Sequence, residues 1–130
     1  MDVACPLCES IATRPLLASN AWAVAFFDAF PVSPGHALVV TRRHVASLFE
    51  LSPDERAGVW ALLEPTREAI LAHHEPAGFN VGVNVGSAAG QTVAHVHVHV
   101  IPRYDGDVED PRGGVRWVIP ERADYWSHRR

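Results

Sequence analysis

The chain has 130 residues and a mass of 14.2 kDa, which is enough for one domain with a core and too short for two ordinary domains. Hydrophobic residues make up 48% and charged residues 20% of the chain, a balance that excludes a disordered or fibrous protein. The net charge of −4 gives no basic field that would hold a nucleic acid, so we expect a single domain over 1–130 with no nucleic-acid partner.

Two residue counts narrow the chemistry. All eleven basic residues are Arg, so the chain has no phosphate-binding lysine of the P-loop type and no lysine for a Schiff base. A covalent step must therefore use another nucleophile. Histidine occurs eight times, and three of these residues fall within positions 95–99. This cluster is the first candidate for a functional site.

The N-terminal region carries both cysteines, Cys5 and Cys8. Their C-x-x-C spacing indicates a metal site, a redox pair or two inert thiols. A redox pair of the thioredoxin type would follow a strand, and none precedes Cys5, which favours a metal site. Residues 1–5 carry no basic segment, and the apolar stretch 21–27 is far shorter than the roughly 18 residues that span a membrane. We expect a soluble cytoplasmic protein with no membrane partner.

Two strands are the first predicted elements. Apolar and aromatic residues fill positions 21–27 and 35–40, a composition typical of buried strands. The segment 28–34 between them carries turn residues, and Pro31 and Pro34 stiffen it. These features predict an antiparallel pair.

Helices are predicted next in the chain. A short one is indicated over 44–50, where apolar residues have the spacing of one helix face. A clearer start follows at Ser52, with Pro53 at the first helical position and Glu55 three residues after the cap. The apolar face of this second helix continues until the Pro-Ala-Gly segment at 76–78 stops it.

Pro65 falls inside this second predicted helix. A proline there removes a hydrogen bond and collides with the carbonyl of Ala61, at a cost of about 3 kcal/mol. We therefore predict one helix with a kink at Pro65 rather than two separate helices.

The last predicted elements are two more strands. Apolar residues alternate with Asn and Gly over 79–85, which is the period of a half-buried strand. A flexible loop covers 86–92, and a final strand runs over 93–101 before Pro102. Strands, helices and then strands predict an α+β domain with an antiparallel sheet.

The final strand contains three alternating histidines, His95, His97 and His99. Successive side chains on a strand point to opposite faces, so the three imidazoles would share one face. That face could be solvated, could bind a hydrolytic metal through two histidines, or could supply a nucleophile. Neutral imidazole can attack phosphorus and form a labile phosphoramidate that water then cleaves. The adjacent Gly-containing loop would donate hydrogen bonds to the phosphate oxygens.

The segment around these residues, GQTVAHVHVHVIPR over 90–103, resembles the motif of the histidine triad family, in which three histidines alternate with apolar residues. The form is that of its fragile-histidine-triad and nucleotide-binding branches. The resemblance extends upstream through Asp28, the segment PGHALVV at 34–40 and the segment LSPDE at 51–55. It covers about residues 5–103, and we place a C-terminal tail over about 104–130.

The resemblance implies a homodimer of α+β protomers, each with an antiparallel sheet of about five strands and two helices. It also implies roles for individual residues. His97 resembles the nucleophile that takes up the nucleotidyl group, His99 the neighbour that contacts the phosphate and the scissile oxygen, and His36 the supporting histidine behind the nucleophile. Asp28 matches the position that holds the ribose hydroxyls. Three polar residues match phosphate-side hydrogen-bonding positions: Asn84, Gln91 and Thr92.

The purine is expected against apolar side chains near the N-terminus and the first strand, because purine pockets need flat apolar walls. Leu7, Ile11 and Phe27 are the candidates. Leu7 and Ile11 would also serve as ordinary core residues, and the sequence leaves both readings open.

The resemblance also bears on metal. Some family members and the related galactose-phosphate uridylyltransferases carry a C-x-x-C pair with two distant histidines as a structural zinc site. Here Cys5, Cys8, His44 and His95 would complete a set of four N and S ligands, as is typical of closed structural zinc sites. This set assigns His95 to structure and leaves His97 and His99 for chemistry. No organic cofactor is expected.

The leading functional hypothesis is a hydrolase or nucleotidyl transferase acting at the α-phosphate of adenosine-phosphate-X compounds, which are dinucleoside polyphosphates or nucleoside phosphoramidates. A covalent nucleotidyl-histidine intermediate would carry the reaction. The alternatives are a nucleotide-binding regulatory protein with incidental catalysis and a zinc-dependent hydrolase. The aromatic tail, with Trp117 and Trp126, would either shape the leaving-group pocket of a dimer partner or cover apolar surface on its own protomer.

Overall fold

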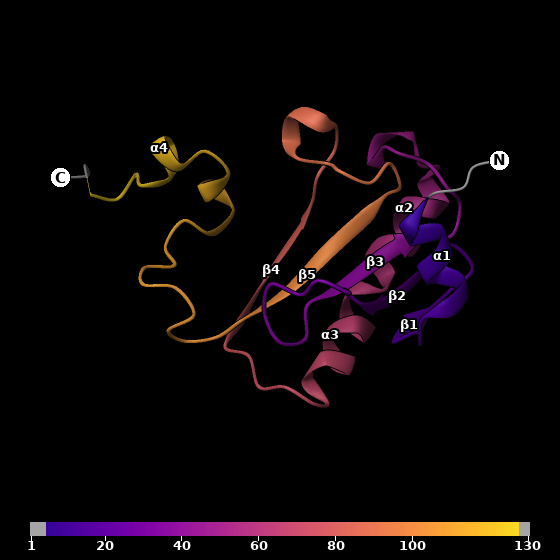
Figure 1. Cartoon of the computed structure of the whole chain (residues 1–130), viewed down its shortest axis with the longest axis horizontal. Coiled ribbons are helices and arrows are strands. Elements are labelled where there is room, and N and C mark those ends of the chain that lie inside the picture. Colours follow the sequence, from indigo (N-terminus) through magenta and orange to yellow (C-terminus); the bar gives the residue numbers. More distant parts are fainter. Residues whose placement is uncertain (1–4, 128–130) are drawn as a thin grey trace.

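The computed structural model of the chain describes residues 5–127. At its centre lies a five-stranded sheet in the order β1-β2-β3-β5-β4 (Figure 1), and every neighbouring pair is antiparallel. The α+β fold and the antiparallel sheet of about five strands are confirmed. The strands are β1 (Ala18–Ser19), β2 (Ala23–Phe27), β3 (Ala37–Thr41), β4 (Gly78–Val83) and β5 (His97–Arg103).

Both faces of the sheet are covered by apolar packing. On one face, helix α1 (Pro6–Thr13) places Leu7 against side chains of β2 and β3 that include Phe26 and Leu38. On the other face, helices α2 (Pro53–Ala61) and α3 (Leu63–Leu71) contribute Val59 and Ile70 to the larger core. Because it has cores on both sides, β3 is buried along its whole length and β2 along nearly all of it.

The predicted antiparallel pair of β2 and β3 is confirmed, although β2 begins at Ala23 rather than at 21. The side chain of Asn20 accepts hydrogen bonds from the backbone N–H groups of Trp22 and Ala23, at 2.8 and 2.9 Å. These bonds hold a turn just before the strand, and an Asn side chain commonly stabilises such a turn.

The first predicted helix, over 44–50, is wrong for most of its length. Only Leu48–Glu50 form a single 3₁₀ turn, capped by the Ser47 hydroxyl. The Val45 carbonyl instead accepts a hydrogen bond from the backbone N–H of Val96, at 2.8 Å. That long-range bond uses the backbone group that a helix beginning at residue 44 would need.

The second predicted helix starts as expected, with a complete capping box between Ser52 and Glu55. The prediction of one kinked helix is wrong, because α2 ends at Ala61 and α3 begins at Leu63. Pro65 lies in the first turn of α3, where the N–H that proline lacks has no intrahelical acceptor. The break therefore lies before the proline rather than at it.

The two last strands are each displaced from the predicted ranges. Strand β4 ends at Val83 rather than at 85, and β5 begins at His97 rather than at 93, which leaves His95 in the connection before the strand. Pro102 lies within β5 and faces Phe79 of β4. It lies beyond Ala37↔Val100, the last pair between β3 and β5, so β3 needs no hydrogen bond from it.

Residues beyond Arg103 extend away from the sheet on the side of β4 (Figure 1). They contain a 3₁₀ turn at Gly114–Val118 and the short helix α4 (Pro120–Ala123). The Arg112 and Arg116 guanidinium groups lie over the rings of Trp126 and Tyr125, so much of this segment packs on itself. No helix within residues 5–127 has the length and apolar character needed to cross a membrane.

Candidate active site

A cleft of about 360 Å³ opens on the face of the sheet that α1 covers. His97 and His99 of β5 lie at one end of the cleft, with Asn84 and Thr92 from the neighbouring connection. Leu7 and Phe26 line the part nearer α1. A cleft of this size falls within the range of small-molecule sites.

The ring of His97 is held by a backbone group. Its Nδ1 lies 2.8 Å from the carbonyl oxygen of His95. A carbonyl only accepts, so Nδ1 carries the proton and donates it to this bond. In the neutral ring, Nε2 then has a free lone pair. His97 is thus set in the tautomer that makes Nε2 a nucleophile.

A second chain of hydrogen bonds fixes the proton of His99. The backbone N–H of Val32 donates to Nδ1 of His36 at 3.1 Å, so the proton of a neutral His36 lies on Nε2. This Nε2 lies 3.0 Å from Nδ1 of His99 and donates to it. The proton of His99 therefore lies on Nε2, from which it can be donated to a phosphate or leaving-group oxygen.

Burial favours the neutral form of both His36 and His99. His36 is only 2% exposed, and its burial lowers its pKa below 6.5 against the opposing charge of Asp28. Burial also lowers the pKa of His99, and the neighbouring rings of His97 and His36 add to that effect. The sequence placed His36 behind the nucleophile, but in the structure it contacts His99 instead.

His36 owes its position to the turn before β3. Gly35 has a φ of +89°, and a β-carbon there would lie 3.0 Å from the ring of His74 and 3.1 Å from Ile70. A side chain at this position would be strained in backbone and crowded by neighbours. The chain therefore needs glycine next to the buried histidine.

Asp28 lies at the rim of the same cleft, directly after β2. One carboxylate oxygen, Oδ1, accepts a hydrogen bond from the backbone N–H of Phe30 at 2.9 Å. The other, Oδ2, lies 3.5 Å from Nε2 of His36. Asp28, His36 and His99 lie close enough to share a cation, but the 3.0 Å bond between the two histidines already uses the facing nitrogens.

The three polar residues predicted for the phosphate side take different places. Asn84 and Thr92 line the cleft. Gln91 does not line it, because its side chain holds the loop: Oε1 accepts from the Gly86 N–H, and Nε2 donates to the carbonyls of Ala46 and Val93. Its polar atoms are already satisfied within the protein.

The predicted purine wall is only partly present. Leu7 lines the cleft, whereas Ile11 packs beside the α1 core without reaching it. Phe27 lies on the opposite face, against the ring of His74. Phe26 lines the cleft in its place. In a strand buried on both faces, composition does not show which of two adjacent residues faces the ligand side.

A larger hollow of about 550 Å³ lies between β4, the end of β5 and the C-terminal segment. Its lining includes Asn80, Arg103 and Trp117 but no histidine. The smaller cleft is the candidate active site because it contains the two imidazoles. No residue of 104–127 lines that cleft within this chain.

The four predicted metal ligands come together next to the cleft. Cys5, Cys8, His44 and His95 each point a donor atom at the others, all within 4.8 Å. The two Nδ1 atoms lie 3.2 Å apart, and Cys8 Sγ lies 3.2 Å from His44 Nδ1 and 3.5 Å from His95 Nδ1. Tetrahedral zinc with ordinary bond lengths separates such donors by about 3.3–3.8 Å, so the set fits that ion.

The hydrogen bond on the other side of the His95 ring also fits a metal ligand. Its Nε2 donates to the Thr41 carbonyl at 2.7 Å, which leaves Nδ1 unprotonated toward the cysteines. Burial of the ring, opposed by this hydrogen bond, lowers the pKa of His95. A buried neutral imidazole fixed by a carbonyl is the usual form of a metal-ligating histidine.

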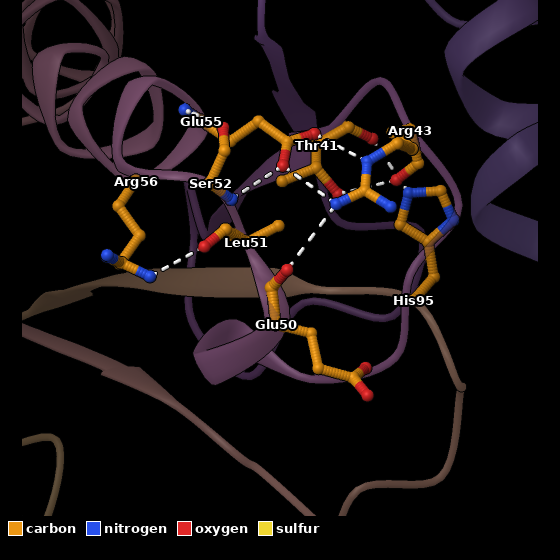
Figure 2. Close-up of polar contacts among 8 residues, drawn as sticks. All are labelled: Thr41, Arg43, Glu50, Leu51, Ser52, Glu55, Arg56 and His95. Atoms are coloured by element: carbon orange, nitrogen blue, oxygen red, sulfur yellow. Dashed lines mark hydrogen bonds and ion pairs between the residues drawn. The ribbon is translucent and has the colours of Figure 1, made fainter.

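A polar network behind Thr41 connects this region to α2 (Figure 2). The Thr41 hydroxyl donates to the Arg43 carbonyl at 3.0 Å. The Arg43 guanidinium makes two bonds of 2.8 Å to the Glu55 carboxylate, and these bonds, with help from Ser52, hold the pKa of Glu55 at about 2. Through Arg43 and Thr41, the α2 capping box is thus connected to the carbonyl that holds the His95 ring.

Comparison with known proteins agrees with the geometry of the site. The family profile of the HIT domain matches residues 13–106. The chain belongs to the HIT family. The resemblance deduced from the histidine pattern is therefore confirmed.

Three relatives illustrate the family. The AP-4-A phosphorylase of Mycobacterium tuberculosis is 42% identical over 84 residues, which is 64% of this chain and 43% of that protein. The chain thus matches less than half of that relative. The adenosine 5'-monophosphoramidase hnt1 of Schizosaccharomyces pombe is 40% identical over 78% of this chain and 71% of that protein. A Zn-bound histidine triad family protein from Mycobacterium smegmatis aligns with a TM-score of 0.70 and 30% identity, covering 80% of this chain and 78% of that one.

Proposed function

We propose that the chain hydrolyses or transfers at the α-phosphorus of purine nucleoside 5'-phosphate compounds, including adenosine-phosphate-X substrates such as phosphoramidates and dinucleoside polyphosphates. The observation that carries this proposal is the hydrogen bond from His97 Nδ1 to the His95 carbonyl. It leaves Nε2 free inside a cleft that also holds a proton donor. The names of the relatives, a phosphorylase and a phosphoramidase, support the same class.

In the proposed mechanism His97 Nε2 attacks the α-phosphorus, and an N–P bond forms as the bond from phosphorus to the leaving group breaks. The Nε2–H of His99 donates a hydrogen bond to the departing atom and stabilises its developing negative charge, and the released group takes up a proton from solvent. His36 donates to His99 Nδ1 and keeps the His99 proton on Nε2. Water then cleaves the N–P bond of the phosphoramidate, releasing the nucleotide and regenerating neutral His97.

The other lining residues support binding in this proposal. Asp28 holds the ribose hydroxyls with the acceptor capacity its carboxylate retains. Asn84 and Thr92 donate to the phosphate oxygens, while Leu7 and Phe26 form the apolar surface for the purine. Gln91 acts through the loop that it closes.

We further propose that Cys5, Cys8, His44 and His95 hold a structural zinc ion. A closed set of four protein ligands leaves no coordination position for substrate, so the ion would contribute stability rather than Lewis-acid chemistry. His97 and His99 lie outside this set. The site joins α1 to the segment before β5, two parts far apart in the sequence.

A homodimer is also part of the proposal. Strand β4 is an edge of the sheet, and Val81 in it is 41% exposed. Unpaired strand edges of this kind are suited to pairing with a second copy. Analytical ultracentrifugation at micromolar concentration tests this, with a monomer mass as the contradicting result.

The proposed activity is tested with a substrate panel of adenosine phosphoramidate, diadenosine triphosphate and diadenosine tetraphosphate. We predict that His97→Ala loses nearly all turnover of every member that the parent cleaves, because the nucleophile is gone, while AMP still binds. A mass-spectrometric search for a nucleotidyl adduct on His97 gives the direct reading. A His97→Ala variant that retains most of its kcat would contradict the covalent mechanism.

A further inference from the structure

Beside Phe26 and α1 the cleft contains a guanidinium group that the proposed mechanism does not use. Arg14 follows directly after α1 and lines the cleft together with Ser10, one helical turn earlier. Both residues are half-buried. A cation at this end of the cleft requires an explanation, because the reacting phosphate lies at the other end.

The sheet register gives the separation. Phe26 of β2 pairs with Leu38 of β3, and Leu38 pairs with His99 of β5. Phe26 is therefore two strands from His99, a distance of about 10 Å. The Arg14 guanidinium carbon lies over the Phe26 ring, 5.8 Å from its centre. Arg14 is thus at the base end of a nucleotide whose phosphate meets His97 and His99.

The donors of Arg14 are available for a ligand. Among residues 5–127, the side chain makes the contact with the Phe26 ring and has no hydrogen-bond acceptor or carboxylate partner. A guanidinium presents five N–H donors in a planar fork and no acceptor. Its position over the Phe26 ring places the fork beside the apolar side chain on which a purine would lie.

The donors of the Arg14 fork match one class of purine base better than the other. A 6-oxopurine such as guanine or hypoxanthine presents two acceptors, O6 and N7, on one edge, which match the fork of an arginine. Adenine presents one acceptor, N7, beside the N6 amino donor, and a group that only donates meets that amino group unfavourably. The Ser10 hydroxyl both donates and accepts, so it does not distinguish the two bases.

We propose that Arg14 is a specificity-determining residue that reads the O6 and N7 edge of the base, so that 6-oxopurine nucleotides are preferred over adenine nucleotides. This inference rests on the proposed function, since it assumes that a purine nucleotide occupies the cleft. It narrows the substrate class to guanosine- or inosine-phosphate-X compounds, with adenosine compounds as the poorer substrates.

The first test is binding, which needs no turnover. Calorimetry with GMP, IMP and AMP on the parent chain should show GMP and IMP binding about tenfold more tightly than AMP, the lower part of the range for a bidentate arginine contact. IMP has O6 but no 2-amino group. If IMP binds like AMP, the 2-amino group of guanine is the feature recognised, and the assignment to Arg14 is overturned.

The second test uses variants at Arg14. Arg14→Met keeps the apolar stem and removes the fork, and should reduce the GMP-to-AMP affinity ratio to about one. Arg14→Lys keeps the charge without the planar fork and should restore little of the ratio. Arg67→Met is the matched control, because Arg67 lies on α3, exposed and paired with Glu64, and its replacement should leave the ratio as in the parent.

Two outcomes would overturn the inference. A parent chain with no preference among the three nucleotides does so without any variant. An equal loss of affinity for all three in Arg14→Met would place the guanidinium on the ribose or phosphate, which the ligands share. Hydrolysis of the guanosine and adenosine 5'-phosphoramidates distinguishes failure of the base preference from failure of the proposed function. Absence of turnover on both compounds refutes the activity. Equal turnover of both refutes only the base selectivity.

Discussion

The histidines of the candidate active site illustrate how hydrogen bonds set the position of a single proton. The imidazoles of His36, His97 and His99 are chemically alike until their partners are considered. The His95 carbonyl holds the proton of His97 on Nδ1, while the Val32 N–H, through His36, holds the proton of His99 on Nε2. The same residue type therefore presents a free ring nitrogen at His97 and an N–H donor at His99, because backbone groups differ in whether they donate or accept.

These assignments predict ring states that can be measured. We expect nitrogen-15 NMR of the histidine rings to show Nε2–H tautomers for His36 and His99, and both to titrate below 6.5, because burial lowers each pKa. Turnover should hold at neutral pH and fall as acid protonates these rings, since a protonated His99 Nδ1 no longer accepts from His36. Titration midpoints above 6.5 for the two rings would contradict this account.

Sequence reasoning identified the histidines but not their partners. The alternation of His and Val shows that His97 and His99 share a face, because the period of a strand is two. It does not show that His36 contacts His99 rather than His97, since that depends on the β3–β5 register, in which Leu38 faces His99. Phe26 and Arg14 were missed for a related reason: their place in the cleft follows from tertiary packing rather than from a local pattern.

At the scale of elements, the N-terminus of α2 is fixed more firmly than an exposed helix end. Glu55 closes the capping box and is only 5% exposed, with Arg43 bound to both carboxylate oxygens. The Arg43 backbone carbonyl accepts from the Thr41 hydroxyl, and the Thr41 backbone carbonyl accepts from the His95 ring. A substitution that disrupts the α2 capping box should therefore also disturb the contacts that hold His95 in the proposed metal site.

We predict that Glu55→Gln lowers the free energy of unfolding at pH 7 by about 1–3 kcal/mol, the range for losing hydrogen bonds to a charged group. The pKa of Glu55 falls from 4.5 to about 2 on folding. The unfolded chain therefore binds this proton first as acid is added, and the stabilisation is lost as the pH falls from about 5 toward 2. Urea denaturation at several pH values measures both effects, with Glu64→Gln as the control because Glu64 is 63% exposed. Parallel pH dependence of the parent chain and Glu55→Gln would contradict the role of this carboxylate.

Features set by neighbouring residues were predicted better than features set by contacts between distant segments. The capping box at Ser52 is a local device and was predicted correctly. The helix expected over 44–50 did not form, because Val45 pairs with Val96, about fifty positions away in the sequence. Helix α1 was not predicted, although Cys5 caps it and Pro6 occupies its first position; a short segment of mixed polarity gave little periodicity from which to infer it.

At the scale of the whole molecule, the cluster of two cysteines and two histidines brings together segments that are far apart in the sequence. Cys5 and Cys8 lie at the start of α1, whereas His95 precedes β5. A metal bound there would hold α1 against the sheet and so keep the wall of the cleft in place. His95 belongs to the cluster through its ring and to the active site through its carbonyl.

We predict that changing Cys5 and Cys8 together to Ser lowers the melting temperature and releases about one zinc ion per chain, while activity survives at low temperature. The ion would stabilise the fold without taking part in the reaction. Elemental analysis of protein prepared without chelator, followed by calorimetric melting, provides the measurement. Protein that contains no zinc under those conditions would refute the site.

The C-terminal segment raises the question of what covers its apolar side chains. Val118 is 78% and Ile119 54% exposed, so these two side chains are not buried against their own protomer. None of residues 104–127 lines the cleft of its own chain. If the segment influences substrate choice, it must do so across the proposed dimer.

We predict that deleting the residues after Pro120 changes the ratio of activity on diadenosine tetraphosphate to activity on adenosine phosphoramidate. The deletion removes the Ala123 carbonyl and the Tyr125 ring, both of which hold Arg116, and so loosens the turn that carries Val118 and Ile119. The two substrates share a nucleotide and differ in their leaving group, so a change in their ratio reports on the leaving-group side alone. Replacing Arg122 with Gln in the full chain controls for lost charge. An unchanged ratio in a deletion variant that is still dimeric would leave the segment without a role in specificity.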